Sequence, residues 1–474
     1  MRADRAIVVL LVAVALAGCA SRPINERITQ VDPKSGYRPY LLIPKLPNND
    51  QSTLFVLSFS GGGTRAAALS YGVLEELRRT ELLVNGQRRK LIDEVDMMTG
   101  VSGGSFTALA YALYGERLFS EYEQRFLKRN VQGELLSRSL NPFNWWKFIG
   151  GSAGRSEIAA EYYDEILFNG ATFGDLLDKP RPVAIATGTD ISTGSRLAFF
   201  QNDFDMLCTD LNKVHLARAA ATSSAVPVVL SALTFNNYGG TCGFQYPAWV
   251  RDVAADKAKH TRTSARALQR YREMRDFQNS KDRPYIHLVD GGVSDNIGVR
   301  GVLEALEELG ASSAFRDEVG FGGIRRIVLI LVNARSAPGT DWDRQESPPG
   351  FVAQLLQSSG VPIDRYSFET VETMKDRAEI VKWRRDLLVA QARLAGATEA
   401  QAEARFPKIT LEVIDVTFDA IADPEERARF MNLPTTFALP AEDIDRLREV
   451  AGRLLRQSPE YESIVRELGG TPAH

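Results

Sequence analysis

Three short segments, far apart in the chain, carry the residue types that acyl transfer requires. The middle segment is Gly-Val-Ser-Gly-Gly, with its serine at position 102. Small glycines around a serine permit the sharp strand-to-helix turn that holds the hydroxyl out at the top of a sheet, as in the Gly-x-Ser-x-Gly elbow of serine hydrolases. This segment therefore offers Ser102 as a nucleophile.

The other two segments offer an oxyanion site and a base. Gly61, Gly62 and Gly63 can turn their backbone N–H groups toward a ligand, and a helix that begins just after them adds the positive end of its dipole. Asp290 is followed by two glycines and provides a carboxylate that can accept a proton from an attacking hydroxyl. Together the three segments predict nucleophilic ester chemistry.

The four histidines of the chain fit a conventional triad poorly. The order Ser, Asp, His leaves only His474, the last residue, and a chain end is a poor catalytic position. His287 stands three residues before Asp290, so in a strand the two side chains point to opposite faces. The remaining two lie in segments that we interpret as helical: His215 and His260. We therefore favour a Ser102–Asp290 pair, with a triad esterase as the alternative.

These segments resemble the patatin-like phospholipases, lipid acyl hydrolases with a Ser-Asp dyad. Two further segments are similar to that family, namely Ala186–Asp190 with the turn after it and the small-residue helix Arg218–Pro227. The resemblance covers Leu54 to Asn333. The sequence contains no His-Glu-x-x-His, no Cys-x-x-Cys and no acidic calcium-loop spacing, so we expect no metal and no cofactor. The resemblance implies the following site residues: catalytic Ser102 and Asp290, and an oxyanion hole of Gly61, Gly62 and Gly63, with Arg65 supporting the loop or the charge.

Two positions depart from the family pattern. Ser60 stands where the family commonly has an acidic residue, and the usual Asn-Pro pair after Asp-Gly-Gly becomes Asn296-Ile297-Gly298. Neither change touches a reacting group. Both leave substrate preference and loop geometry open.

The N-terminus indicates export. Arg2 and Arg5 precede an apolar run from Ala6 to Ala17, which is too short for a membrane span of about twenty residues but suits a signal peptide. The run ends in Leu-Ala-Gly-Cys19, which resembles a bacterial lipobox, so residues 1–18 would be removed and Cys19 lipidated. Ala20 after the cysteine favours the outer membrane. The alternatives are an uncleaved anchor or an ordinary signal peptide.

Residues 19–50 are rich in Pro, Asn and Lys and lack helical periodicity, so we predict an extended tether. Apart from Cys19, the chain has Cys208 and Cys242, an even pair that could close a loop in an oxidising compartment. The sequence leaves a disulfide and two free thiols as equal alternatives.

The composition is that of an ordinary folded protein. With 474 residues, 44% of them hydrophobic, the chain can bury a large core, and a formal net charge of -3 argues against nucleic acid as a partner. Strand patterns alternate with helical patterns, which predicts a patatin-like three-layer α/β/α sandwich with a mainly parallel sheet. The strands are expected at Thr53–Phe59, Val95–Thr99, Val183–Thr189, Arg196–Phe200, Tyr285–Val289 and Arg326–Asn333.

We assign residues 51–335 to the catalytic domain and 336–474 to a helical extension that docks on it. The extension contains helical patterns at Tyr366–Leu394, Pro424–Met431 and Ala441–Leu455, and one strand at Ile409–Val416, which cannot stand alone. Two other segments would suit a lipid surface, the aromatic stretch Asn141–Phe148 and the arginine-rich stretch Arg251–Arg283 with Arg262, Arg266 and Arg270 at helical spacing. A packed loop and a solvated face are the alternatives.

The sequence thus predicts a lipid-anchored envelope hydrolase that cleaves carboxylic esters of glycerophospholipids or lysophospholipids through an acyl-enzyme. An acyltransferase or thioesterase with the same dyad is an alternative, because alcohols can resolve an acyl-enzyme as well as water. A non-catalytic envelope lipoprotein is another. Neither acyl position nor oligomeric state follows from the sequence.

Overall fold

The computed structural model describes residues 22–47, 52–84, 86–141, 154–227, 229–247, 250–251, 262–304, 321–337, 342–406 and 408–471. The predicted signal peptide with Cys19, most of the aromatic stretch 141–148, and both His260 and His474 lie outside these ranges.

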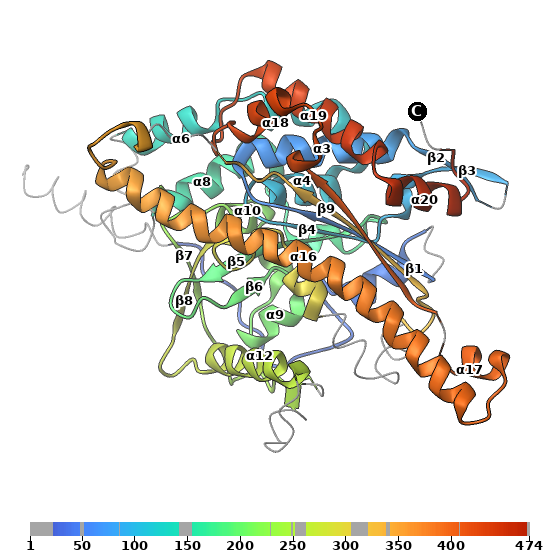
Figure 1. Cartoon of the computed structure of the whole chain (residues 1–474). Helices are drawn as coiled ribbons and strands as arrows, with labels where there is room; N and C mark the ends of the chain where they lie inside the picture. The colour runs from blue at the N-terminus through green and yellow to red at the C-terminus, as the bar shows by residue number, and fades with distance from the viewer. Residues whose placement is uncertain are drawn as a thin grey trace, which may run out of the picture.

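An eight-stranded sheet of described residues forms the centre of the protein, in the order β10-β9-β1-β4-β5-β8-β7 with β6 beside β5 (Figure 1). Neighbouring strands from β10 to β5 are parallel, and β6, β7 and β8 pair antiparallel. The strands are β1 (Thr53–Phe59), β4 (Met97–Gly100), β5 (Val183–Asp190), β6 (Arg196–Ala198), β7 (Leu233–Asn236), β8 (Tyr285–Asp290), β9 (Arg326–Asn333) and β10 (Thr410–Thr417). A separate hairpin joins β2 (Glu81–Val84) to β3 (Gln87–Lys90).

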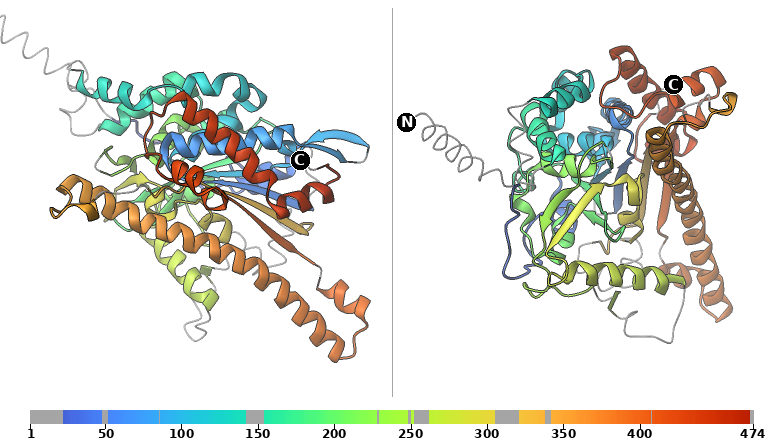
Figure 2. Two further views of the ribbon diagram at one scale, coloured as in Figure 1. Left: turned by 45° about the horizontal axis from the view of Figure 1, so that its top comes forward. Right: turned by 90° about the vertical axis from the view of Figure 1, so that its left-hand side faces the viewer.

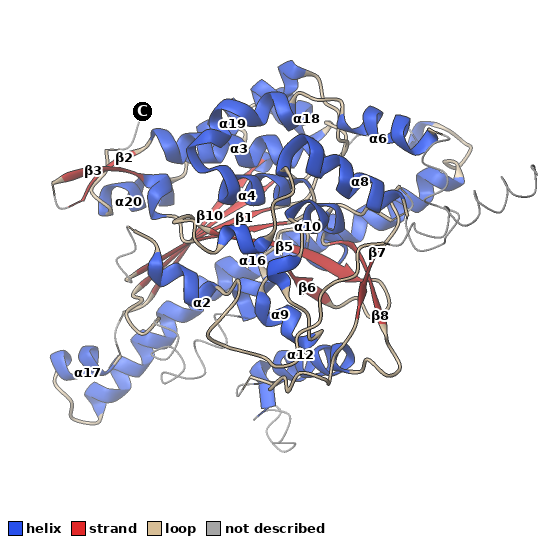
Figure 3. Cartoon of the chain, turned by 180° about the vertical axis from the view of Figure 1, so that it is seen from behind, coloured by secondary structure: helices blue, strands red, loops and turns tan. Residues whose placement is uncertain are grey.

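Helices cover both faces of the sheet. Figure 1 shows α16 crossing the front of the strands, and Figure 3, seen from behind, shows α4 and α10 over the opposite face. The larger helices are α3 (Gly63–Arg79), α4 (Gly103–Tyr114), α6 (Val131–Leu140), α8 (Arg155–Tyr163), α10 (Leu216–Ser223), α12 (Arg262–Gln278), α16 (Phe351–Leu394), α18 (Pro424–Met431), α19 (Ala441–Arg456) and α20 (Pro459–Glu467). The shorter ones are α2 (Pro39–Leu42), α5 (Leu118–Tyr122), α9 (Gln201–Met206), α13 (Gly292–Asp295) and α17 (Glu399–Arg405). The predicted α/β sandwich with a mainly parallel sheet is confirmed.

The C-terminal region is part of this sheet. β10 pairs with β9 in parallel from Thr410 opposite Arg326 to Thr417 opposite Asn333, and it forms one edge of the sheet. α19 packs along α3, where a Cβ on Gly72 would lie 2.4 Å from the carbonyl oxygen of Arg448. Only a glycine allows that approach. Both turned views show α19 against α3 (Figure 2).

The prediction of an extended tether is wrong for residues 22–47. These residues lie on the catalytic domain, where Tyr37 is buried and its hydroxyl bonds the backbone of Ala184. The Arg38 guanidinium forms a buried ion pair with Asp205, with a nitrogen–oxygen distance of 2.7 Å. Irregular segments can be anchored by a few buried side chains without any periodic pattern, and such anchors leave no signal in composition.

A disulfide joins Cys208 to Cys242, with 5.6 Å between the Cα atoms. The same two residues hold the N-terminal segment, because the backbone N–H groups of Ile28 and Val31 donate to their carbonyl oxygens. The disulfide closes a loop of 34 residues and therefore restricts the unfolded chain.

Replacing both cysteines by serine should lower the free energy of unfolding by about 4 kcal/mol, the chain-entropy value for a loop of this length. Urea unfolding of oxidised wild type and of the double variant measures the difference. Reduced wild type should match the variant. Equal free energies of unfolding for oxidised and reduced wild type would show that the disulfide does not stabilise the fold.

The prediction that the arginine-rich stretch Arg251–Arg283 faces lipid is wrong for one of its arginines. Arg270 on α12 is buried and pairs with Asp203 at 2.7 Å, so it cannot meet headgroups. Within the described ranges, no helix is both long enough and apolar enough to cross a bilayer.

Candidate active site

Ser102 stands at a strained strand-to-helix turn. It follows β4 and directly precedes α4, with φ of 48° and ψ of -121°, a conformation that costs a non-glycine residue about 1–3 kcal/mol. The glycines beside it are needed for space, because a Cβ on Gly103 would lie 1.9 Å from the carbonyl oxygen of Gly63. The turn therefore packs closely against the glycine loop and places the serine beside it, as the elbow pattern predicts.

Asp290 is the last residue of β8 and lies at the same end of the central strands as Ser102. β8 runs antiparallel to β5 and places Asp290 opposite Gly188, two residues beyond Ala186, which is level with Gly100 of β4. The Ser102 side chain lies near enough to the Asp290 carboxyl to lower its pKa. Residues 188 positions apart in the sequence are thus brought close together.

Burial controls the charge of Asp290. Loss of solvent raises the pKa of its carboxyl to about 7, against the smaller lowering effects of the hydrogen bond from the Gly292 N–H and of the nearby Ser102 side chain. The Gly292 bond is 2.7 Å long. Both residues of the predicted dyad are almost completely buried, with 5% of Ser102 and 6% of Asp290 exposed. A carboxylate with a pKa near 7 is suited to accept and return a proton at neutral pH.

The C-terminal end of α10 connects both members of the dyad. The Ser223 hydroxyl oxygen accepts a 2.9 Å hydrogen bond from the Ser102 N–H, and the Ser223 carbonyl accepts the Gly291 N–H. The Ala225 carbonyl accepts the N–H of Asp290 at 3.0 Å. Sequence reasoning singled out this helix for its small residues but not Ser223, because a hydrogen bond to a backbone group leaves no pattern.

The glycine loop provides fewer oxyanion donors than the sequence predicts. The Gly61 N–H donates to the carbonyl of Asn296 at 3.0 Å, so Gly61 as a free donor is a prediction that the structure corrects. Within the described residues, the N–H groups of Gly62 and Gly63 have no acceptor. Gly63 has φ of 60° and opens α3, whose first N–H groups lack partners within the helix. These two donors lie beside Ser102 and Gly103.

Arg65 supports the glycine loop. It is buried, which lowers its pKa to about 10, and the side chain is 2% exposed. Its guanidinium donates to the carbonyls of Ala334 and Leu433 and to the hydroxyl of Thr435. These bonds fit the first of the two roles that the resemblance implies for Arg65, support of the loop.

Asn296, to which the sequence analysis assigned no role, links three parts of the structure. Besides accepting from Gly61, it places its side-chain oxygen 2.3 Å from where a Cβ on Gly61 would be. Its side-chain nitrogen lies 3.4 Å from the hydroxyl of Ser367 on α16. The Asp-Gly-Gly turn, the glycine loop and α16 therefore meet at this residue.

The two described histidines do not contact the dyad. His287 bonds the hydroxyl of Thr234 through Nδ1 at 2.9 Å, and His215 precedes α10 as its N-cap. Among the described residues, no group of three or more His, Cys, Asp and Glu side chains is arranged to hold a metal ion.

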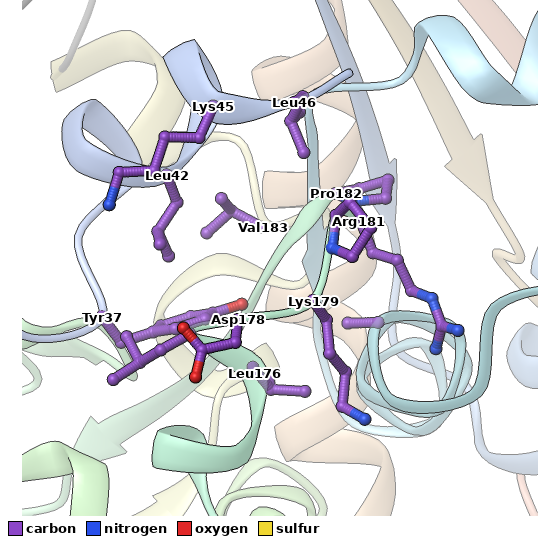
Figure 4. A pocket seen from close by; sticks show the side chains of 13 residues that line it. Tyr37, Leu42, Lys45, Leu46, Leu176, Asp178, Lys179, Arg181, Pro182 and Val183 are labelled. Atoms are coloured by element: carbon purple, nitrogen blue, oxygen red, sulfur yellow. The ribbon is translucent and has the colours of Figure 1, made fainter. Parts of the chain in front are cut away.

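A cavity of about 220 Å³ lies at the far end of the sheet (Figure 4). Its lining includes Tyr37, Lys45, Lys179 and Val183. Val183 begins β5, whereas Ser102 and Asp290 lie beyond the other end of the neighbouring strands. The cavity is therefore not part of the dyad site.

Two solved structures align with most of this chain at low TM-scores, and no match was found among curated proteins. Human GIVD cytosolic phospholipase A2 aligns over 95% of this chain and 68% of its own, with 11% identity and a TM-score of 0.44. VipD from Legionella pneumophila aligns over 96% and 77%, with 11% identity and a TM-score of 0.23. Likeness at this level carries no argument about activity.

The family model described as patatin-like phospholipase matches residues 57–303, more than half of the chain. The matched region contains the glycine loop, the Ser102 elbow and the Asp290 turn, the three segments that meet in the structure. The chain therefore belongs to the patatin-like phospholipase family.

Proposed function

We propose that this protein is a lipid acyl hydrolase that cleaves carboxylic esters of glycerophospholipids or lysophospholipids through a Ser102–Asp290 dyad. The observation that supports this most directly is that the buried Asp290 carboxyl, with a pKa of about 7, lies near the serine on the strained elbow. A serine without an adjacent base is a weak nucleophile, and Asp290 is the base within reach.

The proposed reaction needs only groups of this chain and water. Asp290 takes the Ser102 proton while the serine oxygen attacks the ester carbonyl. Backbone N–H groups of Gly62 and Gly63 then stabilise the negative oxygen of the tetrahedral intermediate. Collapse releases the alcohol, which takes the proton from Asp290, and leaves an acyl-serine. Water then attacks the acyl-serine with Asp290 as base, which yields a fatty acid and restores the serine.

Incubation with phospholipid vesicles that carry one labelled acyl chain tests the proposal. We expect free labelled fatty acid and lysophospholipid as products, and labelling of the protein by an alkyl fluorophosphonate. Transfer of the label to an added alcohol in place of water would indicate an acyltransferase. Neither turnover nor labelling would reject the enzyme assignment.

The pH dependence follows from the state of the base. Asp290 must be ionised to accept the serine proton, and burial raises its pKa to about 7. Initial rates with a neutral ester should therefore rise between pH 5 and pH 8, with half of the maximum near pH 7. A profile that is flat down to pH 5 would contradict an Asp290 base with this pKa.

We also propose export and attachment to the bacterial envelope through a lipidated Cys19. The lipobox-like Leu-Ala-Gly-Cys19 and the disulfide, a bond typical of oxidising compartments, support this. Metabolic labelling with a fatty acid should mark the wild type but not Cys19→Ala. Equal labelling of both proteins would place any lipid elsewhere.

A further inference from the structure

We propose that a segment far outside the family-matched region, Leu433–Phe437, positions the glycine loop for catalysis; we call it the clasp segment. The inference rests on the proposed hydrolase function and adds positioning residues to it. The match ends at residue 303, whereas the clasp segment lies between α18 and α19. The catalytic unit of this chain would then need its C-terminal region.

Arg65 attaches the glycine loop to the clasp segment. Its guanidinium donates to the Leu433 carbonyl and, at 3.1 Å, to the Thr435 hydroxyl, residues nearly 370 positions later in the chain. A third bond of 2.9 Å reaches Ala334, just beyond β9. The planar guanidinium can satisfy several oxygens in fixed directions, which a lysine cannot. Arg65 therefore fixes the distance between loop and segment.

The backbone of Thr436 completes the loop. Its carbonyl accepts the Thr64 N–H at 2.8 Å, and a Cβ on Gly63 would lie 2.4 Å from the same oxygen. One of the free N–H groups of the first turn of α3 is thereby occupied. The two N–H groups before it, those of Gly62 and Gly63, remain free beside Ser102. The clasp segment thus occupies the N–H group of Thr64 and leaves those of Gly62 and Gly63 as candidate oxyanion donors.

A second contact holds the clasp segment from its other side. Gln132 on α6 accepts hydrogen bonds at Oε1 from the Thr436 hydroxyl, at 2.6 Å, and from the Phe437 N–H, at 3.2 Å. Its own N–H donates to the Phe437 carbonyl. The Phe437 ring packs edge-on against Phe106, four residues after Ser102 on α4, with 5.6 Å between ring centres. The clasp segment therefore contacts both the loop and the helix of the nucleophile.

Gln132 is the most informative position for a test because it is exposed and does not contact the dyad. Gln132→Leu removes the acceptor, and Gln132→Glu keeps an acceptor oxygen at the same place. Thr435→Val removes one acceptor of Arg65 from the opposite side. Gln391→Leu, at an exposed position on α16, is the matched control.

We expect Gln132→Leu and Thr435→Val to lower kcat for ester hydrolysis by about tenfold or more, because small misplacements of catalytic groups cost up to about a hundredfold. KM and the melting temperature should stay at wild-type values, which a purely structural role would not produce. Gln132→Glu should retain most of the wild-type kcat, and the control variant all of it.

Wild-type kcat in both Gln132→Leu and Thr435→Val would overturn the inference. Equal losses of kcat in Gln132→Leu and Gln132→Glu would also overturn it, since the acceptor oxygen at position 132 would then make no difference to catalysis. A wild type without esterase activity would instead contradict the proposed function. In that case hydrogen exchange at the Thr64 amide decides whether the clasp segment orders the loop, because exchange should be faster in Gln132→Leu and unchanged exchange would reject it.

Discussion

Ser102→Ala is expected to abolish fluorophosphonate labelling and to lower phospholipid hydrolysis by about a thousandfold or more, since the acyl-enzyme cannot form without the hydroxyl. The backbone should stay intact. The Ser102 N–H still donates to Ser223, and the Ser102 carbonyl still accepts from Ser105. Labelling on a gel and release of labelled fatty acid measure the two effects in the same samples.

Ser120→Ala is a suitable control for this variant. Ser120 is an exposed serine on α5 whose hydroxyl bonds only the Arg117 carbonyl. The Ser120→Ala variant should be labelled by the fluorophosphonate and should hydrolyse phospholipid at the wild-type rate. Labelling that persists in Ser102→Ala at the wild-type rate would identify another nucleophile and reject the dyad.

The central strands could be predicted closely because buried parallel strands form continuous apolar runs. Thr53–Phe59 and Arg326–Asn333 have the predicted ends, and the serine elbow follows from its glycines. β7 (Leu233–Asn236) was not predicted, since four residues carry too little pattern. α16 was expected to begin at Tyr366, yet the helix begins at Phe351 and continues through Pro362.

The site could be predicted as a set of chemical groups but not as a network. Ser102 and Asp290 follow from residue type and chain order, and the structure places them near each other. The partners of Gly61 and Arg65 did not follow, because they are backbone carbonyls of Asn296 and Leu433. Every residue has a carbonyl group, so a sequence holds no signal for which one a donor will meet.

The tether shows the same limit at the N-terminus. Its composition matches that of an unstructured linker, yet Tyr37 and Arg38 are buried. A single aromatic ring that fills a gap, or a single buried ion pair, fixes such a segment without any repeat. Patterns of composition describe the average residue, whereas docking depends on individual ones.

Asp290→Asn should lower kcat by about a hundredfold to ten-thousandfold, the contribution of a general base, while the protein becomes more stable at pH 8. Burial raises the pKa of Asp290 from 3.8 to about 7, so between these values the folded protein binds the proton more tightly than the unfolded chain. The stability from this group is therefore present at low pH and is lost as the pH rises through 7. Asparagine cannot ionise and avoids that loss.

The two effects should therefore have opposite signs at pH 8, with activity lost and melting temperature raised, and the stability difference from wild type should shrink toward pH 4. Asp343→Asn is the matched control, because Asp343 is exposed, and it should change neither quantity. A variant that loses activity and stability together at pH 8 would show that Asp290 supports the fold as an ion. A variant that keeps full activity would remove the Asp290 carboxylate from the mechanism.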